Sequence, residues 1–384
     1  MTPPRPRPRR RALRRVLVPM VAALLTLAAA PADTTPSAGA GPAGIGPAAR
    51  AALAADLRQE CARHPVEAAS PTGWVRSRFE VCVHRRREVV LVTKDRPPKR
   101  LGTMWFDEWQ LGFAYDGDRR VDFVSSLENI QASTVPGQDA RTWPIRVTYS
   151  ATVSDGGGAD IVRPAGQDRT DLWGAWDARP QTVLTYTSPD GAVTTPFKKL
   201  FSTMLVRFEV TGPPGADPYV DERSAVFRVR FDSAGRVAGK TRGTVFPDHK
   251  PTFAVSLGNP DEDESARHID DALRHPVKTF PPTVGKNVPA ELHRLIDPAL
   301  QEQNRAAAGK VCTEVWGDWA GQRLDCDEYP FAATKEGASL SGGHFSARLI
   351  DRDDNQRVGS RLGSTFYGEH RMLDGDAFLV TVVP

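Results

Sequence analysis

A long stretch of alternating apolar and polar residues constrains the fold of this chain more than any other feature. In VRSRFEVCV, Val75, Phe79, Val81 and Val83 fall on one face, and charged residues fall on the other. WPIRVTYSATV, STMLVRFEV and SAVFRVRFD repeat the pattern between turn sequences such as SPDG and DSAG. Short strands of period two, separated by turn residues, are typical of antiparallel sandwiches or barrels. We therefore predict a β-rich domain over residues 60–258.

The N-terminal part of the chain has a composition that does not suit a packed domain. Arginines precede the apolar run VLVPMVAALLTLAAA, and Ala30-Pro31-Ala32 supplies the small residues of a signal peptidase site. Such a run is too short for a comfortable membrane span, so residues 1–32 are predicted to be a secretory signal peptide, with a retained membrane anchor as the alternative. The Gly-, Pro- and Ala-rich sequence that follows predicts a flexible leader over residues 33–59.

The remainder of the sequence predicts a secreted, extracellular protein. No later segment is apolar for long enough to span a bilayer, so no membrane span is expected after signal cleavage. The four cysteines are Cys61, Cys82, Cys312 and Cys326. An even number in an exported protein favours disulfides, and no C-x-x-C or H-x-x-x-H spacing supports zinc. Because the two pairs are far apart in the sequence, local pairing predicts Cys61–Cys82 and Cys312–Cys326.

The pattern changes after Pro260. DEDESARHIDDALRHP has helical spacing, and the following residues have the composition of a linker, so residues 259–287 are predicted to be a helix and a linker. The elements expected beyond it are two short helices broken at Pro298, strands over 312–316 and 345–351, a helix over 358–367 and a closing strand over 378–383. These short elements predict a small α+β domain over residues 288–384 and, with the β-rich domain, a two-domain fold.

A cluster of acidic residues marks the most informative segment of this second domain. DCDEYPFAATKEGA places Asp325, Asp327 and Glu328 within four positions, beside Cys326. Crowded carboxylates repel one another unless a cation lies among them, which suggests a divalent metal site. The predicted Cys312–Cys326 disulfide would fix the backbone next to Asp327, as a catalytic carboxylate requires. On the local sequence alone, an acidic turn exposed to solvent is the alternative.

The wider sequence resembles the NucA/NucB family of extracellular bacterial deoxyribonucleases. The matching residues are Asp325-Cys326-Asp327-Glu328-Tyr329-Pro330-Phe331-Ala332, then Lys335-Glu336-Gly337, then Asp354-Asn355 ahead of a Gly-containing helix. The resemblance covers the C-terminal part of the chain only. This sequence departs from the family pattern at Cys326, where common members carry a charged residue, and at 335–338, where they carry a doubled acid and a doubled glycine.

The resemblance implies a compact ββα-metal fold and a metal-dependent endonuclease that hydrolyses the phosphodiester bonds of DNA without sequence preference. It implies a carboxylate as the general base, for which Asp327 is our first choice and Glu328 the second. Glu336 and Asn355 are expected to hold the metal ion, Mg²⁺ or Mn²⁺, or a water on it. Four arginines are candidates for contacting the phosphates of the substrate: Arg348, Arg352, Arg357 and Arg361.

The charge of the chain limits how it can bind DNA. The net charge is only +3, and the segment from Val277 onward holds more Asp and Glu than Lys and Arg. A nucleic-acid-binding protein normally carries a basic footprint, so DNA binding must rest on a local patch. His344 and His370 fall outside the family motif and are assigned no role.

Two other interpretations concern the whole protein and one motif. Asp351-x-Asp353-x-Asn355 begins like an EF-hand loop, but Gln356 replaces the required glycine and Leu362 the final glutamate, which excludes that site. The alternative function is a secreted β-sandwich binding or adhesion protein with an inactive nuclease-like C-terminal domain. The sequence assigns no role to the β-rich domain and no protein partner or inhibitor.

Overall fold

A computed structural model describes residues 47–153, 168–189, 198–235 and 237–384. The predicted signal peptide, and the predicted leader up to residue 46, lie outside the described residues. All described residues belong to one compact unit, so the division into two domains stays a prediction. None of the described helices is long and apolar enough to cross a membrane.

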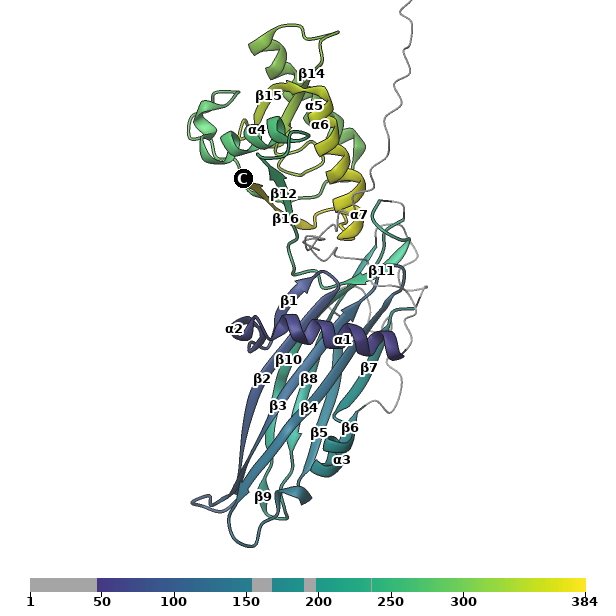
Figure 1. Ribbon diagram of the computed structural model, residues 1–384, viewed down its shortest axis with the longest axis vertical. Coiled ribbons are helices and arrows are strands. Elements are labelled where there is room, and N and C mark those ends of the chain that lie inside the picture. The colour runs from purple at the N-terminus through teal and green to yellow at the C-terminus, as the bar shows by residue number, and fades with distance from the viewer. Residues whose placement is uncertain (1–46, 154–167, 190–197, 236) are drawn as a thin grey trace, which may run out of the picture. The chain divides into compact units, whose positions relative to one another are not determined.

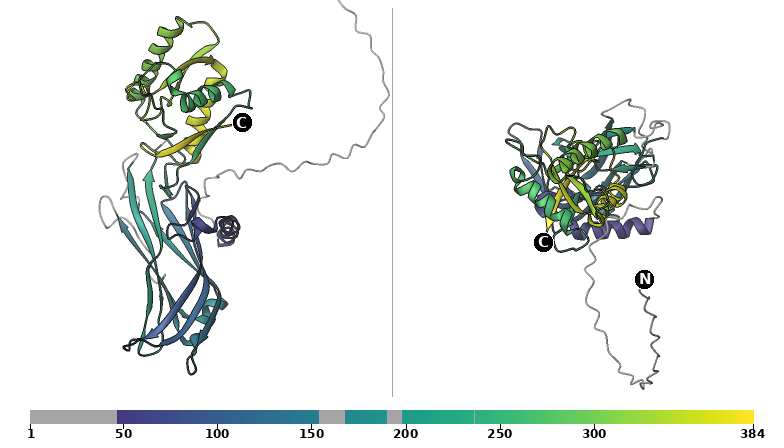
Figure 2. Two further views of the ribbon diagram at one scale, coloured as in Figure 1. Left: turned by 90° about the vertical axis from the view of Figure 1, so that its left-hand side faces the viewer. Right: turned by 90° about the horizontal axis from the view of Figure 1, so that it is seen from above.

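The β-rich part consists of two antiparallel sheets that face each other (Figure 1, Figure 2). The first sheet contains, in spatial order, β1 (Trp74–Ser77), β2 (Glu80–Thr93), β3 (Arg100–Ala114), β4 (Arg120–Thr134) and β7 (Gln181–Thr187), with β9 (Ala216–Asp217) paired to β2. The second contains β11 (Arg242–Val245), β10 (Tyr219–Ser233), β8 (Lys199–Val210), β5 (Pro144–Val153) and β6 (Arg169–Leu172). A short helix, α2 (Pro65–Ala68), precedes β1, and two short helical segments connect strands: η1 (Ala140–Thr142) and α3 (Trp173–Ala178).

The core of this sandwich follows from the alternation in the sequence. Buried and half-buried residues alternate without a break along β8. The ring of Phe106 on β3 lies 4.9 Å from that of Phe208 on β8, and Phe123 on β4 stacks at 5.0 Å on Phe227 of β10. Side chains from both sheets therefore fill one core, as the period-two pattern predicts.

Helix α1 (Pro47–Cys61) crosses the outer face of the first sheet (Figure 1). Its Ala- and Leu-rich sequence favours a helix, and the helix buries Leu57 and Cys61 against the sheet. The Cys61–Cys82 disulfide, as predicted, joins the helix to β2. Residues 47–59 thus form a helix where a flexible leader was predicted. The helix is stabilised because its apolar side chains pack against the first sheet.

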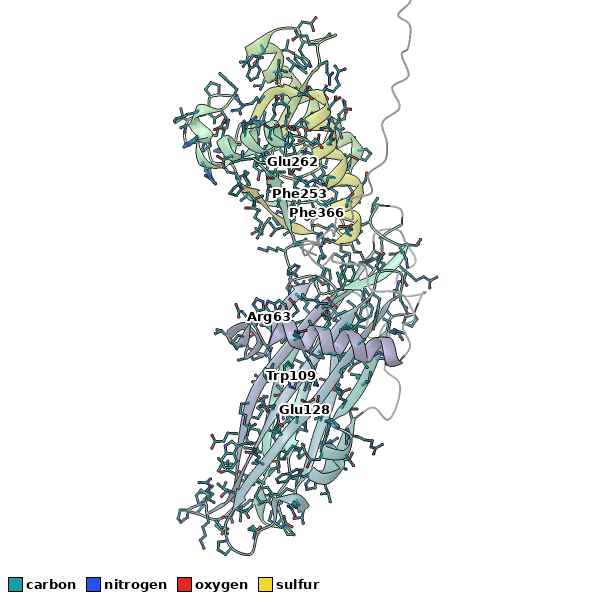
Figure 3. All side chains as sticks on the ribbon, viewed as in Figure 1. Arg63, Trp109, Glu128, Phe253, Glu262 and Phe366 are labelled. Atoms are coloured by element: carbon teal, nitrogen blue, oxygen red, sulfur yellow. A yellow bond between two sulfur atoms is a disulfide. The ribbon has the colours of Figure 1, made fainter. Side chains whose placement is uncertain are left out.

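The C-terminal part combines short strands with helices around a second core. Its elements are β12 (Thr252–Ser256), α4 (Asp263–Arg274), η3 (Pro276–Lys278), β13 (Glu291–His293), α5 (Pro298–Trp316), β14 (Leu324–Tyr329), β15 (Ser346–Asp351), α6 (Arg352–Ser360), the π-helical η4 (Arg361–Phe366), α7 (Tyr367–Glu369) and β16 (Ala377–Val383). β16 lies between β12, to which it is parallel, and β13, while β14 and β15 form an antiparallel pair. Phe253 of β12 and Phe366 of η4 meet in this core at 5.2 Å between ring centroids (Figure 3).

Two predicted elements of this part are wrong. Pro298 does not break a helix but begins α5, where its missing N–H is not needed, and Asp297 caps the helix by accepting from the backbone N–H groups of Ala299 and Leu300. The residues before it form β13 rather than a helix. Residues 312–316, expected to be a strand, continue α5, whereas the predicted strands β15 and β16 are confirmed.

Two elements before residue 288 associate with the C-terminal elements. β12, which falls inside the predicted β-rich domain, is hydrogen-bonded to β16. α4, expected beside a linker, buries Ala266, Ile269 and Ala272 in the C-terminal core. We propose that the C-terminal domain begins just before Thr252.

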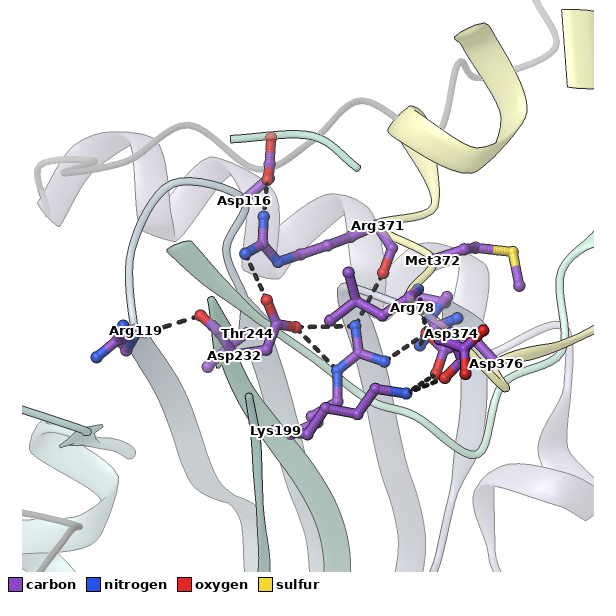
Figure 4. Close-up of polar contacts among 12 residues, drawn as sticks. Arg78, Asp116, Arg119, Lys199, Asp232, Thr244, Arg371, Met372, Asp374 and Asp376 are labelled. Carbon is purple, nitrogen blue, oxygen red and sulfur yellow. Dashed lines mark hydrogen bonds and ion pairs between the residues drawn. The ribbon is translucent and has the colours of Figure 1, made fainter. Parts of the chain in front are cut away.

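Buried charges connect the C-terminal part to the sandwich (Figure 4). The guanidinium of Arg371, which is fully buried, forms ion pairs with Asp116 and Asp232. Its close approach requires a glycine in β11, because a Cβ atom at Gly243 would lie 2.4 Å from the Nε atom of Arg371. Burying a charge is costly unless it is paired, and both aspartates pair with this guanidinium.

A second cluster of the same network surrounds one carboxylate. Asp376 accepts hydrogen bonds from Arg78 at 2.9 Å and from the ammonium of Lys199 at 3.0 Å, and it also binds Arg230. Although burial opposes ionisation, Arg78, Arg230 and Lys199 hold the pKa of Asp376 well below its usual range. The aspartate therefore balances three cations from the sandwich.

Candidate active site

A pocket of about 410 Å³ lies in the C-terminal part, where β14 faces α5 and α6. The acidic motif supplies Asp325, Asp327 and Glu328 to its wall. The other lining residues are Arg305, Cys326, Phe331, Ala332, Ala333, Asn355, Gln356, Val358, Gly359, Leu362, Gly363 and Tyr367. Three of the four residues predicted for catalysis and metal binding, Asp327, Glu328 and Asn355, are thus brought to one cavity.

The local sequence explains why β14 is a rigid support. It is paired in unbroken register with β15, with Asp327 opposite Arg348. The predicted Cys312–Cys326 disulfide is present and joins β14 to α5 one residue before Asp327. The strand ends at Tyr329, whose buried hydroxyl donates to the carbonyl of Pro289 at 3.0 Å, and Pro330 follows. The disulfide and the proline therefore lie on either side of Asp327 and Glu328.

Asp327 is oriented by a histidine that the sequence analysis overlooked. Its Oδ2 atom lies 2.6 Å from Nδ1 of His268, and Nε2 of His268 lies 2.7 Å from the hydroxyl of Ser346. Asp327 is 6 % exposed and His268 is fully buried. The helical spacing places His268 on the same face of α4 as Ser265, Ile269 and Ala272, which marks it as buried but does not identify Asp327 as its partner.

Glu328 differs from Asp327 in its protonation. Burial raises the pKa of Glu328 to about 8, and the charge of Asp327 adds to this, although the N–H of Ala332 donates to its Oε1 atom at 3.2 Å. Without a bound cation, Glu328 therefore keeps its proton at neutral pH. A protonated carboxyl cannot accept a proton from water, which favours Asp327 over Glu328 as the general base.

The two residues of the Asp-Asn pair in the family motif contact different parts of the site. The buried Asp354 accepts from the backbone N–H groups of Glu264 and Ser265, and so holds the first turn of α4 against α6. Asn355, the next residue, lines the pocket. Gln356 donates to Asp325 at 3.1 Å, which ties α6 to β14.

Glu336 is not part of the pocket wall. Its carboxylate accepts from the backbone N–H of His293 at 2.9 Å and contacts Nδ1 of the same histidine at 2.8 Å. Burial raises the pKa of Tyr367, which lines the pocket; Arg294 opposes this rise, and the charge of Glu336 adds to it. The structure thus separates Glu336 from Asn355, although both were expected to hold the metal ion.

The four candidate phosphate-binding arginines also lie outside the pocket wall. Each forms an ion pair with an acidic residue: Arg348 with Asp271 at 2.7 Å, Arg352 with Asp325 at 3.2 Å, Arg357 with Asp261 at 2.5 Å and Arg361 with Glu262 at 2.6 Å. A fifth arginine, Arg305 of α5, lines the pocket, and its partners are the exposed Glu302 and Gln301. No sequence motif marks Arg305.

The chemistry of the pocket suits a hard divalent cation. Asp325, Asp327 and Glu328 offer carboxylate oxygens, and Asn355 and Gln356 offer amide oxygens, the ligand types preferred by Mg²⁺ and Mn²⁺. Within the described ranges, no group of three or more His, Cys, Asp or Glu side chains is placed to hold a metal ion. Mg²⁺ commonly takes only one or two carboxylates, with water and substrate phosphate as its other ligands, so the donor set fits an open site.

Comparison with known proteins agrees with this chemistry. Residues 284–381 match the model of the family described as Deoxyribonuclease NucA/NucB, which confirms the resemblance seen in the C-terminal sequence. The match includes β14, β15 and α6 but leaves the sandwich and α4 outside. No curated protein matched the chain.

Proposed function

We propose that this protein is a secreted, metal-dependent endonuclease that hydrolyses the phosphodiester bonds of DNA. The observation that carries the proposal is the pocket, in which Asp327 and Glu328 of the acidic motif meet Asn355 inside the segment that matches a deoxyribonuclease family. Two disulfides, Cys61–Cys82 and Cys312–Cys326, support an oxidising, extracellular location.

Asp327 is the general base in this proposal. Its Oδ2 atom is bound to His268, and Oδ1 has no hydrogen-bond partner among the described residues, so Oδ1 is available to accept a proton from the attacking water. Glu328 keeps its proton at pH 7 while no cation is bound, so it is the second choice for the base. General-base catalysis contributes about 10² to 10⁴ in rate, which sets the size of the effect expected from Asp327.

A divalent cation, Mg²⁺ or Mn²⁺, would neutralise the phosphate and stabilise the leaving 3′ oxygen when bound here. The candidates for holding it are Asn355, which lines the pocket, and Glu336, which would have to exchange its bonds to His293 for the ion. Arg305 is placed to bind a phosphate directly. Arg357 forms an ion pair that is half exposed, and such pairs are weak enough for a DNA phosphate to compete with.

Plasmid cleavage with the full mature chain tests the proposal. Supercoiled DNA should become nicked and then linear with added Mg²⁺ or Mn²⁺, and EDTA should stop the reaction. Asp327→Asn should lower the rate by about 10² or more while DNA binding persists, because binding rests on other groups. Asp353→Asn removes an exposed charge from α6, outside the pocket, and should cleave normally.

Cleavage that persists in EDTA, or in Asp327→Asn at the wild-type rate, would contradict the proposal. If Glu328→Gln loses cleavage activity and Asp327→Asn does not, the general base is Glu328 rather than Asp327. The alternative, a binding protein with an inactive nuclease-like domain, predicts no cleavage at all. The presence of Asp327, Glu328 and Asn355 in one pocket argues against that alternative.

A further inference from the structure

We propose that His268 is a positioning residue for Asp327, and that α4, which precedes the family-matched segment, is a working part of the active site. The inference rests on the proposed nuclease function. It assigns a role to α4, which lies before residue 284, where the family match begins.

The geometry places the imidazole between two strands. His268 reaches from α4 to Asp327 on β14 and to Ser346 on β15, at 2.6 and 2.7 Å. His268 is fully buried and Ser346 is 1 % exposed, so water does not compete for these hydrogen bonds. Buried polar groups hold their partners more firmly than exposed ones do.

The hydrogen-bond inventory fixes the roles of the atoms. A neutral imidazole has one donor and one acceptor nitrogen, and an ionised carboxylate can only accept. Nδ1–H of His268 therefore donates to Asp327, and Nε2 accepts from the hydroxyl of Ser346. Both ring nitrogens are satisfied in this tautomer.

The same three residue types form the catalytic triad of serine hydrolases, in which the serine acts on the substrate. Here the aspartate occupies that end of the chain of hydrogen bonds. Ser346 is buried and does not line the pocket, so it cannot attack a substrate. Asp327 is the member that meets the pocket. The serine thus orients the histidine, the histidine orients the aspartate, and the aspartate acts on the substrate.

The position of α4 is in turn fixed by α6. Asp354 binds the first turn of α4 through the N–H groups of Glu264 and Ser265. The next residue, Asn355, lines the pocket. One helix therefore sets the orientation of the base relative to α6, and among the described residues no other side chain forms a hydrogen bond with Asp327.

Two amide variants separate positioning from packing. The side-chain nitrogen of His268→Asn reaches the place of Nδ1 and can still donate to Asp327. The amide of His268→Gln reaches the place of Nε2, keeps the contact with Ser346 and leaves Asp327 without its donor. Both lose the ring, so their packing defects match, and thermal unfolding of both should confirm this.

We expect His268→Gln to lower kcat for DNA cleavage by about 10- to 100-fold with KM unchanged, because a displaced catalytic group loses rate rather than binding. His268→Asn should stay within about 5-fold of wild type, since it restores the hydrogen bond. Equal losses in both variants, or wild-type kcat in His268→Gln, would overturn the inference.

A spectroscopic measurement tests the contact without activity. In the full mature chain labelled with ¹⁵N-histidine, the Nδ1 proton of His268 should give a resonance protected from exchange with water. The resonance should lose this protection in Asp327→Ala. If it is unprotected in the wild type, the inference is wrong even if DNA is cleaved. If wild-type protein does not cleave DNA but the resonance is protected, the proposed nuclease function fails and the contact stands.

Discussion

Replacing Glu328 by glutamine should make the protein more stable at alkaline pH. Desolvation of the half-buried Glu328 raises its pKa from the ordinary 4.5 to about 8, and the charge of Asp327 adds to the rise. A raised pKa in the folded state contributes stability below pH 4.5, and this contribution is lost as the pH rises through 8. Glutamine resembles the protonated acid at every pH and carries no such penalty.

The magnitude follows from linkage. Each tenfold change in proton affinity corresponds to about 1.4 kcal/mol, so wild-type protein should lose about 4 kcal/mol between about pH 5 and about pH 8.5 through this group. Glu328→Gln should therefore match the wild type within about 1 kcal/mol at the lower pH and exceed it by about 4 kcal/mol at the higher pH. The difference between variant and wild type removes the titration of all other groups.

Urea denaturation of the full mature chain in EDTA, at both pH values, measures this difference. Glu314→Gln, which removes an exposed carboxylate from α5, is the control and should change stability equally at both pH values. Added Mg²⁺ should reduce the advantage of Glu328→Gln at high pH, because a nearby cation stabilises the ionised acid. If the extra stability of Glu328→Gln does not grow with pH, the burial argument is wrong. If added Mg²⁺ does not change this extra stability, no metal ion binds near Glu328.

Three further outcomes are expected. Replacing Cys312 and Cys326 together by alanine should cost about 3 kcal/mol in urea unfolding and lower cleavage, since the disulfide closes a short loop beside the base; unchanged stability would contradict this. Asp376→Asn should cost about 3 to 5 kcal/mol, because it leaves two buried arginines and the half-buried Lys199 without their shared partner, and a loss of less than about 1 kcal/mol would show that the network is not formed. Asn355→Ala should raise the Mg²⁺ concentration for half-maximal cleavage, whereas Asp353→Asn on the same helix should not; equal metal dependence would remove Asn355 from the metal site.

The sequence predicted the parts of the fold that depend on local pattern. The period-two alternation predicted antiparallel sheets in a sandwich or a barrel, and local pairing of the cysteines predicted both disulfides. The acidic motif brought Asp327 and Glu328 to the pocket because they are neighbours on one strand. Such features depend on few residues that are close in sequence.

Features that depend on distant partners were not predictable. His268 lies far from Asp327 in the sequence, and only the arrangement of α4 across β14 and β15 joins them. The candidate arginines carry charge in the sequence, but their acidic partners lie in other elements, as Asp271 does for Arg348. Glu336 matches the motif, yet β13 supplies a histidine that engages it.

Pro298 illustrates a different difficulty, because the same residue begins some helices and ends others. Its effect depends on whether the preceding residue can cap the new helix, and Asp297 does so through its side chain. The sequence contains this capping pattern, but the apolar spacing of the residues before Pro298 predicted a helix there instead.

The place of β16 in its sheet determines when the active site can form during synthesis. β16 lies between β12 and β13, and α4 packs against both β12 and β16. A growing chain therefore holds β12 and β13 without their common partner until residues 377–383 have been added. Before that moment α4 can pack against β12, β14, β15 and α6, but its contact with β16 is missing. Completion of this sheet is therefore a late step in the assembly of the C-terminal part.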